Sequence, residues 1–402
     1  MLLDDSLTGW AGHNAGYDFS IQDELTRRGI GSVIFANMQA KELLVARSAG
    51  LQLVFHHYAD LTHREYAHIR LPSGVAGAFY LLIGNWNHFI DLLRGTWGEL
   101  QSGDIVLTAM HSSVTSFAMA VWLMLQRLRG KRLTYLFVVH NYPTRFFRAE
   151  WITLHNLGRG HRLLIGAHTQ DIANQCRKIT GQPVVLLPLP FAGRGTNSVT
   201  EECSLDPAPQ QVRPRIVTYL GMATYQKGYD LVVSALEKLT DLLSERLASF
   251  VVQFNSFLYD DQNMRWKQRL LEGLGGKPGF TLVEGALDET EYLDRLAGAD
   301  ILLVPNRAEF YAGALSGVFT EAVAVGKPVI VAEGTFMATE LQKGVGAGLI
   351  FRDNDAHDLA ITIEQAIASY PDIRLRASAY ALTWRENHSP QRYVDILLGA
   401  IQ

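Results

Sequence analysis

The sequence has few cysteines and no long apolar run. Only Cys176 and Cys203 occur among 402 residues, which is too few for a disulfide framework and is typical of proteins in a reducing cytoplasm. The longest uninterrupted apolar run, residues 117–125, is nine residues long, whereas a helix that crosses a bilayer needs roughly 20. Acidic Asp4 and Asp5 stand where an export signal has basic residues. These absences predict a cytoplasmic protein without membrane spans.

The charges are divided unevenly along the chain. Residues 1–200 hold 18 Lys and Arg against 13 Asp and Glu, a balance of +5, and residues 201–402 hold 18 against 27, a balance of −9. This division favours two domains with different partners, and an acidic molecule or an anionic membrane surface suits the first. The alternative is that the uneven charges are simply solvated and have no function. Basic residues are not clustered with interleaved aromatic ones in any recognised nucleic-acid-binding module, so we do not expect nucleic acid as a partner.

Short apolar runs alternate with amphipathic segments throughout, which is typical of parallel sheets covered by helices. In the first half, strands are expected at residues 32–36, 51–56, 104–108, 133–140, 162–167 and 184–187, and helices at 17–28, 79–94, 114–127 and 169–179. In the second half, strands are expected at residues 215–220, 250–254, 280–283, 301–305, 328–332 and 349–351, and helices at 229–243, 265–274, 289–297, 317–325, 356–369, 371–385 and 390–401.

Residues 192–214 lack a periodic apolar face and are rich in Gly, Ser, Thr and Pro, which predicts a linker. The fold class is therefore α/β, with two doubly wound domains. The predicted division is an N-terminal domain at 1–191, the linker at 192–214, a C-terminal domain at 215–385, and a final helix at 386–402 that packs back toward the N-terminal domain. Ligands of such sheets bind at the carboxyl ends of the strands.

The most informative stretch is residues 299–339. A buried strand ends at Pro305, a polar loop follows, and Ser316 and Gly317 open a helix that carries Glu321. Free N–H groups and the dipole at a helix start suit a phosphate, and the carboxylate suits ribose hydroxyls. An ordinary capped helix with a solvated glutamate is the alternative.

This stretch resembles the nucleotide-sugar motif of GT-B glycosyltransferases, particularly family 4 and related bacterial polysaccharide enzymes. Their Glu-x7-Glu pattern ends in a helical Glu-Ala that Gly-Lys-Pro-Val follows, as do Glu321, Ala322 and residues 326–329 here. Residues 219–239 resemble the start of that family's C-terminal domain, with Lys227 at the place of a phosphate-binding lysine. The resemblance implies two Rossmann-like domains that face a central cleft. It also implies a nucleoside diphosphate sugar, of UDP or GDP type, as donor substrate and no separate cofactor.

The sequence departs from this pattern at two places. The family pattern places its first glutamate eight residues before the second, but the residue eight positions before Glu321 is Gly313. Glu309 is the nearest carboxylate that could replace the missing glutamate as a catalytic group. Gly221 is followed by methionine where the family has a phosphate-binding arginine, and we expect Arg307 to replace that cation. A subset of the family begins its helix with Ser-Gly, and this arrangement assigns donor binding to the backbone around the residues Tyr311, Ser316, Gly317 and Val318.

The N-terminal half resembles the family more loosely. Gly12 and His13 resemble the glycine-rich loop that faces the donor phosphates. His13 could donate a hydrogen bond to a phosphate or act as a base. The alternative is that it is an ordinary polar loop residue. His140 ends a predicted strand, where the family often has a histidine close to the transferred sugar. Asn141 and Arg145 follow it and are expected to line the acceptor side.

No metal site is expected. Asp260 and Asp261, and the acidic cluster at 353–355, lie in loops between helices and not at strand ends. The second cluster is better explained as the cap of the helix that follows.

These expectations combine into one function. The predicted activity is metal-independent transfer of a sugar to a glycan or lipid-linked acceptor, and the resemblance implies retention of anomeric configuration. The predicted location is cytoplasmic or peripheral to the inner face of the cell membrane. A nucleotide-sugar epimerase and a catalytically inactive GT-B scaffold of a polysaccharide assembly complex are the alternatives.

Overall fold

The computed structural model divides the chain into two compact units, which are described separately here. The first unit comprises Met1–Ala192 and Ser389–Gln402, and the second comprises Gly193–His388. The structure describes residues 1–7, 14–40, 50–56, 73–98, 100–108, 115–140, 142–144, 146–190, 214–256 and 261–402. The predicted linker, apart from Pro214, lies outside these residues.

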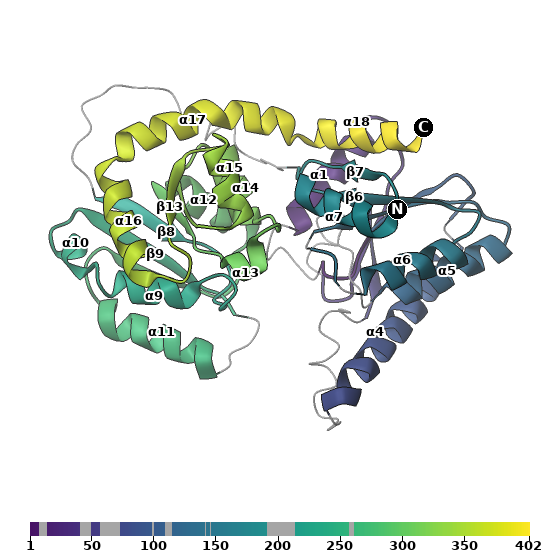
Figure 1. Cartoon of the computed structure of the whole chain (residues 1–402), viewed down its shortest axis with the longest axis horizontal. Coiled ribbons are helices and arrows are strands. Elements are labelled where there is room, and N and C mark those ends of the chain that lie inside the picture. The colour runs from purple at the N-terminus through teal and green to yellow at the C-terminus, as the bar shows by residue number, and fades with distance from the viewer. Residues whose placement is uncertain are drawn as a thin grey trace. The chain divides into compact units, whose positions relative to one another are not determined.

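The first unit is a seven-stranded parallel sheet with helices on both faces (Figure 1). Its strands are β1 Leu2–Asp4, β2 Ile34–Asn37, β3 Leu51–Phe55, β4 Ile105–Thr108, β5 Thr134–Val139, β6 Arg162–Ala167 and β7 Val184–Leu186. Its helices are α1 Asn14–Arg27, α4 Ser73–Thr96, α5 Ser116–Leu128, α6 Phe147–Leu157, α7 Gln170–Thr180 and α18 Pro390–Ile401. The strand order is β3-β2-β1-β4-β5-β6-β7.

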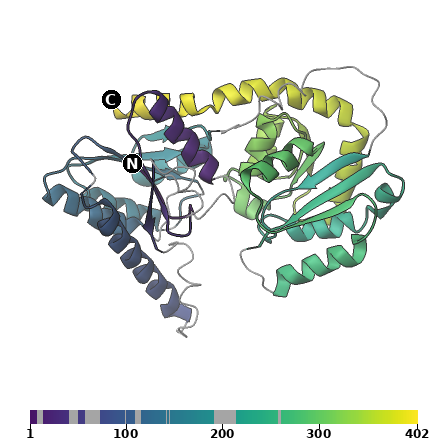
Figure 2. The same cartoon turned by 180° about the vertical axis from the view of Figure 1, so that it is seen from behind.

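The second unit is a six-stranded parallel sheet, also covered on both faces (Figure 2). Its strands are β8 Arg215–Tyr219, β9 Ala248–Phe254, β10 Phe280–Glu284, β11 Ile301–Val304, β12 Val329–Ala332 and β13 Gly348–Phe351, in the order β10-β9-β8-β11-β12-β13. Its helices are α9 Tyr229–Leu236, α10 Thr240–Ser244, α11 Asp261–Leu274, α12 Glu289–Gly298, α13 Ala308–Tyr311, α14 Gly317–Ala324, α15 Phe336–Gln342, α16 Ala356–Ala368 and α17 Tyr370–Asn387.

The doubly wound architecture confirms the predicted fold class. Strands such as β11 and β12 are buried along their whole length, because helices cover both faces of a parallel sheet. In each unit the strand order reverses next to the first strand, between β1 and β4 and between β8 and β11. The carboxyl ends at these switch points are where open α/β sheets bind ligands.

The differences from the predicted elements have physical causes. β1 has three residues, too few for a visible pattern, and α6, which begins at Phe147, is not among the predicted helices. The predicted helix at 229–243 is two helices, α9 and α10. The helix predicted at 114–127 is α5, which crosses from β4 to β5 and places Met119, Trp122 and Leu123 in the core. Among the described helices, none has the length and apolar character that a bilayer crossing requires.

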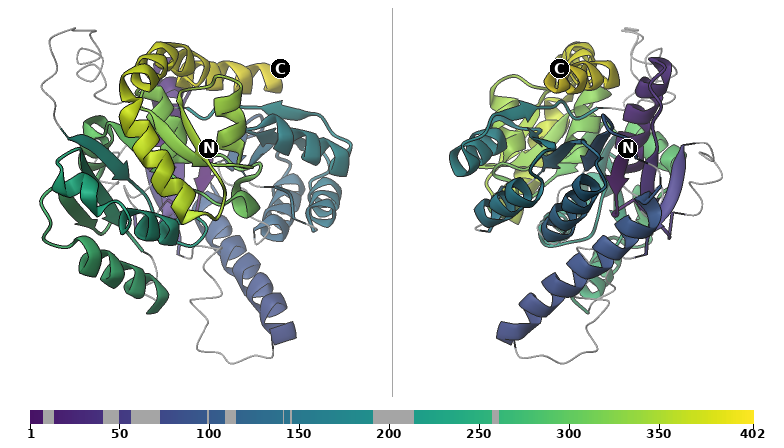
Figure 3. Two further views of the ribbon diagram at one scale, coloured as in Figure 1. Left: turned by 60° about the vertical axis from the view of Figure 1, so that its left-hand side comes forward. Right: turned by 90° about the vertical axis from the view of Figure 1, so that its right-hand side faces the viewer.

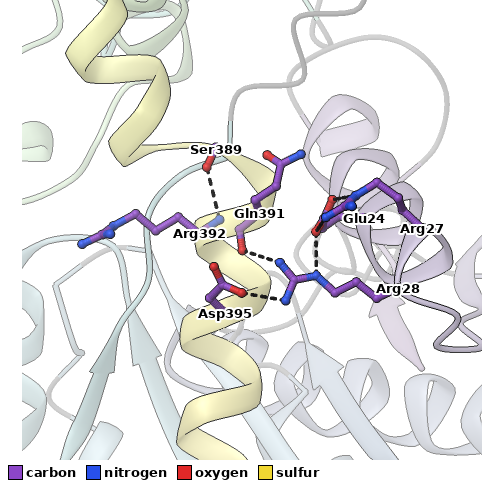
Figure 4. A network of polar contacts seen from close by, with 7 residues as sticks. All are labelled: Glu24, Arg27, Arg28, Ser389, Gln391, Arg392 and Asp395. Carbon is purple, nitrogen blue, oxygen red and sulfur yellow. Dashed lines mark hydrogen bonds and ion pairs between the residues drawn. The ribbon is translucent and has the colours of Figure 1, made fainter.

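The C-terminal helix α18 packs against α1 within the first unit. At the exposed edge of this contact, Arg28 lies between two carboxylates: it bonds Glu24 at 2.6 Å on its own helix and Asp395 at 2.6 Å on α18 (Figure 4). In the interior, the hydroxyl of Tyr17 donates to that of Tyr393 over 2.8 Å, and both rings are buried. The buried pair is the stronger restraint, because water competes little for it.

Substitution at the two contacts should therefore have unequal effects. Tyr393→Phe leaves the Tyr17 hydroxyl without its acceptor in a buried place and is expected to lower the free energy of opening of α18 by about 1–2 kcal/mol. Asp395→Ala removes only an exposed ion pair and is expected to cost at most about 1 kcal/mol. Amide hydrogen exchange of α18 measures both values, and equal effects would contradict the assignment.

Candidate functional site

The donor-side candidates gather at the switch point of the second sheet. Lys227 lies in the loop after β8, and Arg307, Tyr311 and Ser316 lie in the segment after β11, the strand that pairs with β8. The two segments are joined directly, since the amide of Arg307 donates to the carbonyl of Gln226 over 3.0 Å. The structure thus brings these predicted residues to one edge of one sheet.

The start of α14 is an uncapped helix terminus in a buried place. Ser316 occupies the N-cap position in extended conformation, but its hydroxyl caps no helix N–H. The residue is 2% exposed, and its side-chain oxygen has no hydrogen-bond partner among the residues that the structure describes. The first N–H groups of a helix have no intrahelical acceptor, and buried polar atoms normally have a partner. Hydroxyl and amides together form a donor-rich place that suits an anion.

Glu321 lies one turn further along α14, beside the cation of Lys227. Burial raises the pKa of Glu321 to about 7, against the lowering effects of a hydrogen bond from Tyr292 and of the charge on Lys227. The Tyr292 hydroxyl, on α12, donates to the carboxylate. The Lys227 ammonium is 6.0 Å from the ring centroid of Tyr311. A carboxyl group held this way can accept hydrogen bonds from sugar hydroxyls.

Arg307 does not have the predicted role of a phosphate-binding cation. Its side chain is 3% exposed, and its terminal nitrogens donate to both carboxylate oxygens of Asp230 at 2.9 Å. They also donate to the carbonyl of Tyr225 at 2.6 Å, while Nε donates to Asn354 at 2.5 Å. Because these donors are already hydrogen-bonded, Arg307 holds the segment after β11 to the segment after β8 and does not face a ligand. Lys227 is then the side-chain cation of the site among the described donor-side candidates.

Gly228 brings the Lys227 loop against the end of β11. Its φ of +66° is left-handed, and a Cβ at this position would lie 2.1 Å from the carbonyl oxygen of Pro305. Only glycine permits so close an approach in this conformation. The position of Lys227 therefore depends on the glycine that follows it.

The acidic cluster at 353–355 directly follows the end of β13, so the expectation that it lies between helices and away from strand ends was wrong. Its carboxylates accept hydrogen bonds from backbone amides, which include the predicted cap of the helix that follows. The carboxylate of Asp355 accepts from the amides of His357 and Asp358, both at 3.0 Å, at the start of α16. Asp353 accepts from the amide of Ala308 at 3.2 Å. Glu309, the predicted substitute for the missing carboxylate, lies in α13 and is exposed.

In the first unit, His140 follows β5 and joins an aromatic cluster at the carboxyl ends of the strands. Its ring centroid is 4.6 Å from that of His168, which follows β6, and 6.4 Å from that of Tyr17 on α1. A hydrogen bond of 3.0 Å between Nδ1 of His168 and the carbonyl of Leu187 fixes the orientation of the His168 ring. Both histidines are half-buried. Gly12, His13, Asn141 and Arg145 lie outside the described residues.

Two buried carboxyl groups near this cluster were not anticipated. Asp4 ends β1, and Asp18 lies beside it on α1 with none of its surface exposed. Burial raises the pKa of each carboxyl, and the neighbouring Asp4 raises that of Asp18 further. His168, Tyr292 and Asp18 were missed because the sequence does not reveal spatial neighbours. Of the three, His168 alone could have been predicted from the sequence, because it directly follows the strand expected at 162–167, just as His140 ends the strand expected at 133–140.

Comparison with known proteins agrees with the fold. Residues 206–384 match the family described as glycosyl transferases group 1. Solved structures resemble the whole chain: a glycosyltransferase from Rickettsia africae (TM-score 0.62, 14% identity, covering 100% of this chain and 96% of that one), the trehalose-6-phosphate synthase OtsA (0.67, 13%, 100% and 98%), and Anabaena HepE in complex with UDP (0.61, 14%, 99% and 99%). No curated protein sequence matches the chain significantly.

The second unit thus contains a glycosyl transferases group 1 domain. With two doubly wound units and solved structures of the same architecture, the chain has the GT-B fold. The narrower resemblance to family 4 stays a prediction.

The contact between Gly228 and Pro305 can be tested with a matched pair of glycines. Gly228→Ala and Gly276→Ala both place a side chain at positive φ, 66° and 73°, but the added Cβ at Gly276 has no neighbour within 4 Å. We expect Gly228→Ala to lower the free energy of unfolding by about 1–3 kcal/mol more than Gly276→Ala, because it alone overpacks the backbone. Urea unfolding of both variants measures the difference, and equal losses would refute the contact.

The titration of Glu321 makes stability depend on pH. A carboxyl whose folded pKa lies near 7 keeps a proton that the unfolded chain loses near pH 4.5, so its contribution to stability falls as the pH rises through that window. Glu321→Gln, neutral at every pH, should match wild type near pH 4.5 and exceed it by about 3 kcal/mol at pH 8. Scanning calorimetry across this range is the measurement, and a pH-independent difference would exclude the titration.

Proposed function

We propose that this chain transfers a sugar from a nucleoside diphosphate sugar to a glycan or lipid-linked acceptor, without a metal ion and with retention of anomeric configuration. The observation that carries the proposal is the buried start of α14, where the unpaired hydroxyl of Ser316 adjoins free helix amides one turn from Glu321. In this assignment the amides and Lys227 hold the diphosphate, and Glu321 accepts from the ribose.

The charges of the site support a metal-independent mechanism. A diphosphate leaving group accumulates negative charge as the glycosidic bond breaks, and donors fixed in advance stabilise that charge. The helix amides, the dipole of α14 and the ammonium of Lys227 are such donors. His140, at a strand end in the first unit, is assigned to the transferred sugar, with His168 against its ring as a positioning residue.

The nucleotide is proposed to be uridine diphosphate. HepE from Anabaena was solved with UDP and with UDP-glucose, and it shares the fold of this chain. The acceptor is proposed to be anionic and held at or near the inner face of the cell membrane, because residues 1–200 carry a net charge of +5.

Nucleotide binding tests the donor site. Isothermal titration with UDP, GDP and ADP is expected to show binding of UDP. Lys227→Met should weaken it about 10-fold to 100-fold, as expected when a charge-assisted hydrogen bond worth roughly 1.5–3 kcal/mol is lost. Lys343→Met is the control, since Lys343 is an exposed lysine of the same unit that pairs with Glu340. Absence of binding by any of the three nucleotides would favour a scaffold without donor chemistry.

The catalytic assignment has a separate readout. His140→Ala is expected to abolish release of UDP from UDP-glucose in the presence of acceptors while leaving UDP affinity unchanged. His155→Ala, an exposed histidine on α6, is the control. If the enzyme forms an epimerised sugar from the donor alone, the transferase assignment is wrong and the protein is an epimerase.

A further inference from the structure

The hydrogen bond between Tyr292 and Glu321 joins two helices at the carboxyl-end edge of the second sheet. Both α12 and α14 connect strands in the same direction along the sheet, so right-handed crossovers place them on one face, opposite α9 and α11 (Figure 3). Each of the two helices follows a strand and therefore begins at the edge where such sheets bind ligands. Tyr292 lies in the first turn of α12, and Glu321 lies in the second turn of α14. The bond is thus close to the buried start of α14.

This bond occupies one oxygen of the Glu321 carboxylate. The hydroxyl of Tyr292 donates to Oε2, and no residue in the described part of the chain donates to Oε1. Burial and the adjacent charge of Glu321 raise the pKa of Tyr292 well above its usual range, so the phenol keeps its proton and remains a donor. A hydrogen bond to an ionised carboxylate is stronger than one between neutral groups. The carboxylate is therefore held in one orientation, with one oxygen left for a ligand.

A ribose offers this carboxylate more hydroxyls than it has free oxygens. The hydroxyls at C2′ and C3′ are neighbours, and a carboxylate with both oxygens free can accept from both at once. In this site the second hydroxyl meets an oxygen that Tyr292 already occupies. Lys227, whose charge acts on the same carboxyl, offers only donors and cannot replace the occupied oxygen as an acceptor. The two hydroxyls are therefore not equivalent for Glu321.

A second tyrosine–carboxylate bond in the same unit shows how a purely structural pair differs. The hydroxyl of Tyr370 donates to Oδ1 of Asp300 over 2.8 Å, directly before β11 at the opposite edge of the sheet. The other oxygen of Asp300 accepts from the amide of Ile216 over 2.8 Å. The protein itself thus uses both oxygens of Asp300, whereas Tyr292 leaves one oxygen of Glu321 free.

We propose that Tyr292 determines specificity for the nucleotide: by holding Oε2 of Glu321, it restricts recognition of the ribose to one of its two hydroxyls. The inference rests on the proposed function, in which the ribose of the donor lies at Glu321, and it adds which part of that ribose is recognised. A nucleotide that lacks the other hydroxyl is accepted. Tyr292 acts through Glu321 and is a positioning residue.

Isothermal titration of the full-length protein with deoxynucleotides tests the proposal. UDP and GDP are each compared with their 2′-deoxy and 3′-deoxy forms at pH 8, above the pKa of about 7 to which burial raises Glu321. For wild type, one deoxy form should bind within about threefold of the parent nucleotide. The other should bind about 10-fold to 100-fold more weakly, as expected when a hydrogen bond to a charged group is lost.

Two phenylalanine variants separate specificity from structure. Tyr292→Phe frees Oε2, so both hydroxyls are recognised, and the two deoxy forms should then bind within about threefold of each other and both more weakly than the parent. Tyr370→Phe removes the matched bond at the opposite edge and should keep the wild-type pattern. The wild-type comparison needs no variant, so a folding defect in Tyr292→Phe does not remove the test.

Two results would overturn the inference while the proposed function stands. One is equal affinity of wild type for the two deoxy forms. The other is a Tyr292→Phe variant that changes the affinity for all three nucleotides by one common factor, as a loss of packing alone does. If neither UDP nor GDP binds, the proposed function fails and the inference fails with it.

Discussion

The guanidinium of Arg307 ties together the segments that form the donor side of the second unit. It pairs through two nitrogens with Asp230 at the start of α9, and it also bonds Asn354 and the carbonyl of Tyr225, whose ring lies 3.6 Å from its central carbon. A charge with 3% exposure is stable only when it is paired, and removal of one partner from a buried pair typically costs about 3–5 kcal/mol. The loop of Lys227 and the approach to α14 therefore share one brace.

The proposed binding of a nucleotide has to overcome the acidic character of the second unit's sequence. The balance of −9 in residues 201–402 repels a nucleotide at long range, but salt screens such fields beyond about 10 Å. Within that distance the helix terminus at Ser316 and the ammonium of Lys227 dominate. Glycine stands at Gly313, where the family pattern has its first carboxylate, so one negative charge fewer would oppose the diphosphate of the proposed donor.

The sequence predicted the two sheets well because burial on both faces leaves a continuous apolar run in each strand. It also placed Lys227, Ser316 and Glu321 at one sheet edge, since parallel strands end together. It did not show which polar groups pair with one another. Arg307 looked like a free cation because its partner Asp230 is 77 residues away in the chain. Tyr292 and His168 escaped notice for the same reason: hydrogen bonds and ring contacts between distant residues leave no periodic trace.

The helix α18 has a consequence for the order in which the chain folds. Its partner in the interior, Tyr17, is separated from Tyr393 by 376 residues. The whole second unit is therefore synthesised between the two parts of the first. On the ribosome the first unit must wait, lacking its last helix, until the C-terminus emerges, and α1 meanwhile exposes the surface that Tyr393 later covers. The entropic cost of closing a loop grows only slowly with its length. The long separation therefore delays the completion of the first unit and prolongs the exposure of α1, but it lowers the free energy of unfolding little.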